Sequence, residues 1–192
     1  MAAASSSEVA GLVLDLASSR PPSLGAGRLV CVDGPAGSGK TTLGRALAAA
    51  TGAALVHTDD LMEGWGGFAT VASQLTGLVT NLAAGRTAGY RVYDWHAGRF
   101  DATVELEPAP WLVVEGVGSG EPAIAPHITV LAWVEVDDTL RLARGLARDG
   151  AQMEPFWRTF MGAERELFAR HRTQERADVL VDGTGTRAPV VR

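Results

Sequence analysis

The strongest constraint on this 192-residue chain is one glycine-rich segment, Gly34-Pro-Ala-Gly-Ser-Gly-Lys40-Thr41. It matches the pattern G-x-x-x-x-G-K-[ST], and it lies between an apolar run, residues 29–33, and a helical segment, residues 41–50. In such a loop the glycines let successive backbone N–H groups point at phosphate oxygens, and the lysine reaches the outer phosphates. Strand, loop and helix in this order predict a nucleotide-binding site in an α/β domain.

The lysine of this loop is also unusual within the chain. Of the 17 basic residues, Lys40 is the only lysine and the others are arginines. A compact ammonium on a flexible stem is not interchangeable with a planar guanidinium where it must lie between phosphates. The presence of lysine rather than arginine at position 40 therefore favours the same phosphate-binding role.

Composition and charge exclude several classes of protein. The chain is 46% hydrophobic and 20% charged, which predicts one folded domain rather than a disordered or fibrous protein. A formal net charge of −5 argues against binding to nucleic acid or to an acidic membrane. The single cysteine, Cys31, excludes an intrachain disulfide framework. Glu8 and Asp15 do not fit a secretory signal, and no apolar run could span a membrane, so we expect a cytoplasmic protein.

Apolar runs and helical periodicities alternate along the chain. We expect strands at 29–33, 53–57, 90–95, 111–115, 128–136 and 178–181, and helices at 7–18, 41–50, 70–84, 137–148 and 154–171. The segments 58–68 and 96–109 have no clear periodicity and are expected to be loops. This pattern predicts a P-loop NTPase fold of class α/β, with a mostly parallel five-stranded sheet, helices on both faces and a small lid at about 148–156. Residues 1–24 form a leading helix and linker, and residues 25–192 form the domain.

The residues that could carry chemistry all follow or end a predicted strand. They are Gly34, Asp59, Asp94, Glu115 and Gly183. Ligands of parallel sheets bind beyond the carboxyl ends of the strands. We therefore expect these residues to share one cleft.

The absence of further lysines narrows the class of nucleotide-binding protein. A GTPase reads guanine with an Asn/Thr-Lys-x-Asp segment, which cannot exist here because Lys40 is the only lysine. Large mechanical ATPases have additional domains, for which 192 residues leave little room. Kinases of small molecules remain.

Three further motifs carry a family resemblance. With the phosphate loop, the segments His57-Thr-Asp-Asp-Leu61, Val113-Val-Glu-Gly116 and Ala177-Asp-Val-Leu-Val-Asp-Gly183 resemble the uridine kinase branch of the P-loop kinases. The likeness covers most of residues 28–183 and leaves the leading helix outside. It implies ATP and Mg²⁺ as cofactors and transfer of the γ-phosphoryl group to a hydroxyl of a small molecule, with a nucleoside as the favoured acceptor. The partner would be this acceptor, with neither nucleic acid nor a membrane involved, and a homo-oligomer stays open.

The resemblance assigns roles residue by residue. Asp59 falls on the general base, Glu115 on the acid that holds Mg²⁺ through water together with Thr41, and Arg144 and Arg148 on the lid arginines that act with Lys40 in catalysis. Arg141 is a weaker match on the same helix face. The alternative is that Asp59 or Asp60 only caps the next helix and that the arginines form a solvated face. The residues expected to hold the nucleotide are Gly34, Pro35, Ala36, Gly37, Ser38, Gly39, Lys40, Thr41, Thr42 and Gly183.

The acceptor side is expected around Asp94, which stands where the family has an aspartate for sugar hydroxyls. Trp65, Trp95 and His96 would line this pocket, or the aromatic side chains would only pack. The sequence also departs from the family. Leu-Met follows Asp60 where Phe-Tyr is usual, Gly145 replaces an arginine, and the lid at 150–155 is short and not basic.

Two other functions stay open at this level. A nucleoside-monophosphate kinase or another small-metabolite kinase would need arginines for an acidic acceptor, and Arg86, Arg91 and Arg99 are available near Asp94. A nucleotide-binding regulator or chaperone-like ATPase would transfer nothing to a small molecule. For such a protein, loss of the Asp59 carboxylate would leave function unchanged.

Overall fold

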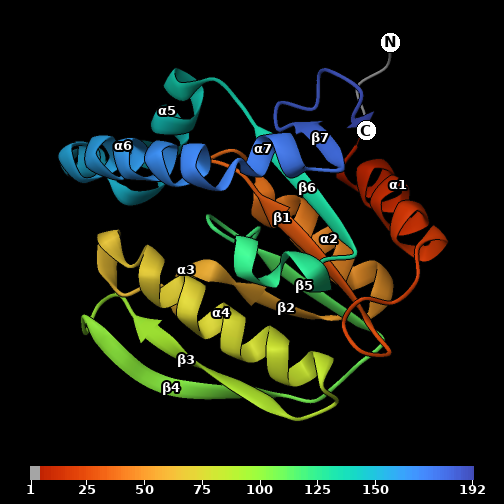
Figure 1. Cartoon of the computed structure of the whole chain (residues 1–192). Helices are drawn as coiled ribbons and strands as arrows, with labels where there is room; N and C mark the ends of the chain where they lie inside the picture. The colour runs from red at the N-terminus through yellow and green to blue at the C-terminus, as the bar shows by residue number, and fades with distance from the viewer. Residues whose placement is uncertain (1–4) are drawn as a thin grey trace.

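A six-stranded sheet forms the centre of the molecule in a computed structural model that describes residues 5–192 (Figure 1). Five of its strands are parallel, as predicted. The strand β1 (Arg28–Asp33) lies in the middle of these five, and a loop follows its carboxyl end. The sixth strand, β8 (Val190–Val191), runs antiparallel beside β7 (Val179–Asp182) and was not predicted. The order across the sheet is β2 (Ala54–His57), β5 (Trp111–Glu115), β1 (Arg28–Asp33), β6 (Val130–Glu135), β7 (Val179–Asp182) and β8.

Alternation along the strands divides the core into two layers. Leu29 and Cys31 of β1 pack toward α4 (Phe68–Ala83) and α6 (Glu154–His171), whereas Val30 and Val32 pack toward the opposite layer of helices. That opposite layer contains α1 (Ser6–Ser19) and α2 (Lys40–Thr51). Because successive side chains of a strand point to opposite faces, a run of apolar residues covers both faces at once.

The leading helix α1 is packed onto the domain. It begins with a capping box in which Ser5 and Glu8 satisfy each other's backbone N–H groups. Val13 and Ala17 are fully buried in the layer that α1 shares with α2. This packing brings the first turn of α1 to the same cleft as the glycine-rich loop, which the sequence did not indicate.

The segment 96–109 contains a strand, and the expectation of an irregular segment was wrong. β3 (Ala88–Asp94) and β4 (Arg99–Leu106) form an antiparallel hairpin that is separate from the main sheet and lies against α4 and α3 (Thr58–Leu61). The available signal was strict alternation, because Phe100, Val104 and Leu106 alternate with polar residues. Asp94 therefore ends a hairpin strand and not a strand of the parallel sheet.

A longer helix follows β6 and begins beyond the carboxyl end of that strand. α5 (Asp138–Asp149) is capped by Asp137, which accepts from the backbone N–H of Thr139, and it ends at Gly150. Between residues 5 and 192, no helix combines the length and apolar character needed to cross a membrane. The short elements are the 3₁₀ helices η1 (Gly64–Gly66), η2 (Pro122–His127) and η3 (Ala151–Met153), and the helix α7 (Thr173–Arg176).

Candidate active site

The glycine-rich segment forms a loop between β1 and α2. Lys40 is almost fully buried, and its ammonium donates to the carbonyl oxygen of Pro35 at 2.9 Å, across the loop. Gly183, from the loop after β7, lies so close that a Cβ there would be 2.0 Å from the Ser38 carbonyl oxygen. A glycine at this position lets the two loops meet and close one side of the site.

Two of the loop's amides donate to side chains of the protein. Asp33, fully buried at the end of β1, accepts from the N–H of Gly34 at 2.7 Å and from the N–H groups of Gly118 and Gly120. The N–H of Ala36 donates to Glu164 of α6 at 2.8 Å. These bonds hold the start of the loop in place, and Gly34 and Ala36 have their N–H groups engaged by side chains behind the loop.

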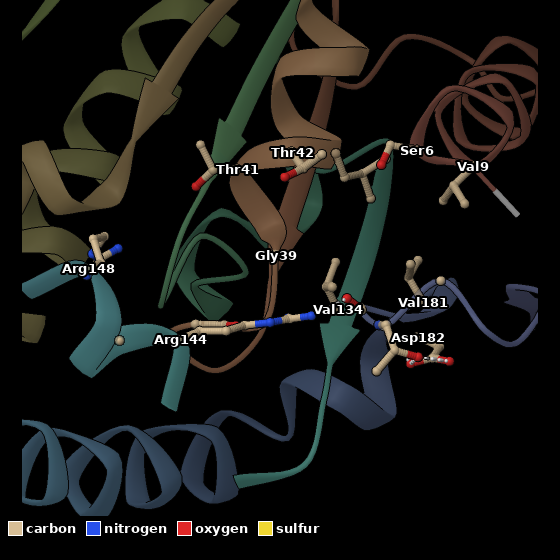
Figure 2. A pocket seen from close by; sticks show the side chains of 16 residues that line it. Ser6, Val9, Gly39, Thr41, Thr42, Val134, Arg144, Arg148, Val181 and Asp182 are labelled. Atoms are coloured by element: carbon tan, nitrogen blue, oxygen red, sulfur yellow. Dashed lines mark hydrogen bonds between the residues drawn. The ribbon is translucent and has the colours of Figure 1, made fainter. Parts of the chain in front are cut away.

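A cleft of about 460 Å³ opens on the other side of the loop (Figure 2). Five residues expected to hold the nucleotide line it: Gly37, Gly39, Thr41, Thr42 and Gly183. This volume is within the usual range of small-molecule sites. Ser6 and Val9 of α1 line the end opposite Arg148, and sequence reasoning missed them because their place in the cleft depends on how α1 packs.

Three polar side chains converge where β2 and β5 end. The Thr41 hydroxyl donates to the Glu115 carboxylate at 3.0 Å, and His57 Nδ1 lies 2.5 Å from the same carboxylate oxygen. Glu115 is buried, and its hydrogen bond raises the pKa of His57, although partial burial of the ring acts in the opposite direction. Thr41 and Glu115 thus form a hydroxyl–carboxylate pair next to the phosphate loop. In the part of the chain from Ser5 onward, no group of three or more His, Cys, Asp or Glu side chains could form a metal site of its own.

Asp59 and Asp60 lie in the first turn of α3, directly after β2. Neither caps a helix, since His57 occupies the N-cap position and no side chain bonds there, so the capping alternative was wrong for this helix. α3 approaches β5 closely because Gly116 has φ +125°, and a Cβ there would be 2.0 Å from the Thr58 hydroxyl. This contact places the segment with Asp59 next to Glu115.

The Asp59 carboxylate faces charges from three other elements. Desolvation has the largest effect on this carboxylate and raises its pKa. The positive charges of Lys40 and Arg148 lower the pKa, and the negative charge of Glu115 raises it. The residue is nevertheless exposed, so solvent and ligands reach it. Across residues 5–192, no hydrogen bond or ion pair engages this carboxylate, whereas the Asp59 carbonyl oxygen accepts from the indole N–H of Trp95 and from the backbone N–H of Met62. A reachable carboxylate with a raised pKa is a stronger base than an ordinary surface aspartate.

The three arginines of α5 differ in their surroundings. Arg141 is buried and paired with Glu164 and Asp138, so it faces away from the cleft. Arg144 is exposed and donates to the carbonyl oxygens of Gly37 and Gly183, at 3.3 Å each. Arg148 pairs with Asp149 and lies over the ring of Trp157. Arg144 and Arg148 line the cleft beside the glycine-rich loop, whereas Arg141 does not.

Aromatic side chains gather beside Asp59. Trp65 contacts four rings, with centroid distances of 5.6–6.3 Å, and these belong to Trp95, Phe156, Trp157 and Phe160. Trp95 and Phe156 stay largely exposed. The group joins the η1 loop, the β3–β4 hairpin and the first turns of α6, and it provides flat apolar surface next to the carboxylates.

The other expected acceptor residues lie at the hairpin tip. Asp94 accepts from the backbone N–H groups of His96 and Ala97, so one carboxylate oxygen stabilises the turn, and these bonds lower its pKa. His96 is exposed. The expectation that Arg86, Arg91 and Arg99 are all available near Asp94 was wrong for Arg86. Arg86 donates to Asn81, beyond the opposite end of β3, while Arg91 lies over Phe100 and Arg99 pairs with Asp101.

The comparisons with known proteins rest on structure. No protein-family model matches the sequence, and no curated protein is detectably similar to it. A Bacillus stearothermophilus protein described as a possible uridine kinase is similar in structure, with a TM-score of 0.60 and 20% identity, over 91% of this chain and 100% of that chain. A Silicibacter sp. TM1040 protein described as a candidate fructose transport system kinase has a TM-score of 0.65 and 19% identity, over 86% and 95% of the two chains.

A third structure, of the YGR205w protein, matches with a TM-score of 0.55 and 10% identity over 98% of this chain and 99% of that one. At 10–20% identity these likenesses concern architecture. Together with the phosphate loop and the parallel sheet, they assign this chain the fold of the P-loop kinases.

Proposed function

We propose that this protein is an ATP- and Mg²⁺-dependent kinase that transfers the γ-phosphoryl group of ATP to a hydroxyl of a small molecule, with a nucleoside as the favoured acceptor. The observation that carries the proposal is the position of Asp59. Its carboxylate is reachable, is not engaged by a cap or an ion pair, and lies in the field of Lys40, Glu115 and Arg148. A nucleotide-binding regulator that transfers no phosphoryl group would not require a general base at this position.

In the proposed reaction, Asp59 takes the proton of the acceptor hydroxyl while the hydroxyl oxygen bonds to the γ-phosphorus and ADP leaves. Loop amides that face the cleft and the Lys40 ammonium bind the phosphates. Arg144 and Arg148 bring positive charge to the transferring group from the lid helix. Closure of the lid excludes water, which limits simple hydrolysis of ATP.

The side chains near the loop fit a magnesium ion that arrives with the nucleotide. Mg²⁺ prefers oxygen ligands and keeps several waters, and the Thr41 hydroxyl and the Glu115 carboxylate are oxygen donors already facing each other. When bound, the ion would neutralise negative charge on the phosphates. The protein supplies only these two contacts, in keeping with a metal that is held mainly by substrate and water.

Charge favours a nucleoside over a nucleoside monophosphate. Asp59 and Asp60 are adjacent in α3, and the negative charge of Glu115 acts on both, so a phosphate there would meet carboxylates. Arg91 and Arg99 line a separate groove with Phe100, and Arg86 lies farther away. A neutral acceptor with a flat ring suits carboxylates and the exposed rings of Trp95 and Phe156 better.

The test is ADP release with Mg²⁺ and ATP against a panel of nucleosides, nucleoside monophosphates, sugars and vitamin-like alcohols. The proposal predicts that a neutral ring-bearing alcohol raises turnover well above the rate without acceptor, and that omission of Mg²⁺ abolishes it. Turnover that only monophosphates raise would support the monophosphate kinase instead. No stimulation by any acceptor would contradict kinase chemistry.

A further inference from the structure

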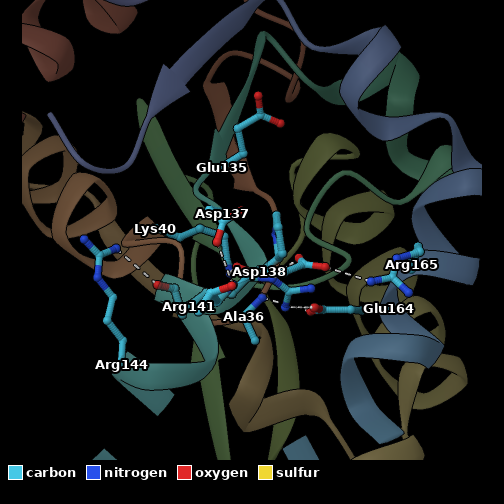
Figure 3. Close-up of polar contacts among 12 residues, drawn as sticks. Ala36, Lys40, Glu135, Asp137, Asp138, Arg141, Arg144, Glu164 and Arg165 are labelled. Carbon is cyan, nitrogen blue, oxygen red and sulfur yellow. Dashed lines mark hydrogen bonds and ion pairs between the residues drawn. The ribbon is translucent and has the colours of Figure 1, made fainter. Parts of the chain in front are cut away.

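A buried ion pair lies behind the phosphate loop, on the side away from the nucleotide cleft (Figure 3). Arg141 of α5 is 2% exposed and Glu164 of α6 is fully buried, and their charged groups are in direct contact. Burial of two charges is costly unless each is well paired, so neither side chain can be removed without leaving the other uncompensated.

Glu164 also contacts the phosphate loop. One of its carboxylate oxygens pairs with Arg141, and the other accepts the Ala36 N–H at 2.8 Å. The backbone of Arg141 approaches the loop from the same side, because a Cβ on Gly37 would be 2.6 Å from the Arg141 carbonyl oxygen. Of these two neighbouring loop residues, Ala36 is hydrogen-bonded to α6 and Gly37 lies close against α5.

The same network fixes the start of α5. Arg141 donates to Asp138 at 2.8 Å, and the second oxygen of Asp138 pairs with Arg165 of α6 at 2.9 Å. Arg144 and Arg148 follow Arg141 by three and seven residues, on the face of α5 that lines the cleft. Since α5 is a continuous helix, the direction in which Arg141 is held sets where both cleft arginines lie.

We propose that Glu164 is a positioning residue that fixes the phosphate loop and the lid arginines relative to each other, so that both contact the same phosphates. This inference rests on the proposed function. Glu164 touches neither nucleotide nor acceptor and acts through Ala36 and Arg141. Its loss should therefore weaken phosphate binding and transfer while the acceptor pocket stays intact.

The test compares Glu164→Gln with Glu166→Gln, which makes the same change at an exposed position of the same helix. The glutamine at 164 keeps an oxygen for the Ala36 N–H and loses the ion pair with Arg141. We expect binding of a fluorescent ATP analogue to weaken about tenfold in Glu164→Gln, and not in Glu166→Gln. In steady state, KM for ATP should rise and kcat should fall, while KM for the acceptor stays unchanged.

A structural role alone would lower thermal stability and leave the affinity of the remaining folded protein unchanged. If Glu164→Gln does not fold, Glu164→Asp keeps the charge but is one methylene shorter, and the same loss of affinity is expected. Wild-type affinity in a folded variant at position 164 would overturn the inference. The binding measurement needs no acceptor, so it gives an answer even if the proposed kinase reaction fails.

Discussion

Asp33 stands at the last position of β1, and its buried carboxylate accepts from backbone N–H groups on two loops. Desolvation is the largest effect on this group and raises its pKa from 3.8 to about 6, although the three N–H groups act in the opposite direction. The ionised form is therefore disfavoured in the folded protein. Ionised Asp33 costs free energy because it is buried, but the same carboxylate joins the phosphate loop to the loop that follows Glu115.

This pKa gives a signed prediction for stability. Because the folded value lies above 3.8, the contribution of Asp33 is fully present below about pH 4 and is lost as pH rises through about 6. The free energy of unfolding of wild type, measured relative to Asp33→Asn, should fall by up to roughly 3 kcal/mol across this interval. Urea denaturation of both proteins from pH 4 to 7 provides the measurement. A constant difference would show that Asp33 does not titrate there.

Packing around Gly145 explains why the arginine that is usual at this position in the uridine kinase branch is absent. A Cβ at this position would lie 2.3 Å from the Trp157 ring, so the side chain of the usual arginine has no room. We expect Gly145→Ala to lower the free energy of unfolding by about 1–3 kcal/mol through overpacking. Gly162→Ala in α6, where a Cβ meets nothing within 4 Å, should instead stabilise by about 0.5–1 kcal/mol. Equal effects in thermal denaturation of the two variants would contradict this packing argument.

Single residues were predictable from sequence to different degrees. The phosphate loop and Asp59 stand in motifs with a fixed place after a strand, so the sequence located them. Glu164 had no such signal, because a glutamate within an amphipathic helix is normally exposed, and only the pairing with Arg141 explains its burial. The bond between Asp94 and its own turn also depends on the hairpin, which had not been predicted.

At the scale of elements, α1 has a place that its sequence does not reveal. Its periodicity predicted an amphipathic helix, but not that its first turn would line the nucleotide cleft. In the β3–β4 hairpin, β3 was predicted and β4 was not. β4 is mostly exposed, so its apolar residues are too few to form the continuous run that marks a buried strand.

A pair of substitutions tests the place of α1. Ser6 lines the cleft, whereas Ser7 is exposed and does not line it. We expect Ser6→Trp to obstruct the cleft and weaken binding of an ATP analogue several-fold, on the order of 1 kcal/mol, with Ser7→Trp as the matched control. Fluorescence titration gives both affinities. Equal affinities would mean that the nucleotide does not extend to α1.

Taken as a whole, the molecule places two kinds of surface at the same edge of the sheet. The cleft proposed to hold the nucleotide runs from Arg148 past the phosphate loop to α1, and the aromatic group around Trp65 lies beside Asp59, where the acceptor is proposed to bind. The parallel sheet accounts for this meeting, because β1, β2 and β5 all deliver their carboxyl ends there. The fold was therefore largely predictable, whereas the acceptor's identity depends on side chains of the hairpin and the lid that carry no sequence motif.

The most direct test of the account compares Asp59→Asn with Asp60→Asn, each measured for nucleotide affinity and for phosphorylated acceptor. Both variants remove one carboxylate from the same turn, but only Asp59 is assigned the acceptor proton. The account predicts that Asp59→Asn lowers kcat by about 10²–10⁴-fold while its affinity for ATP stays near that of wild type, and that Asp60→Asn keeps most of its activity. Full transfer by Asp59→Asn would contradict the account, because the proposed base would then not be needed.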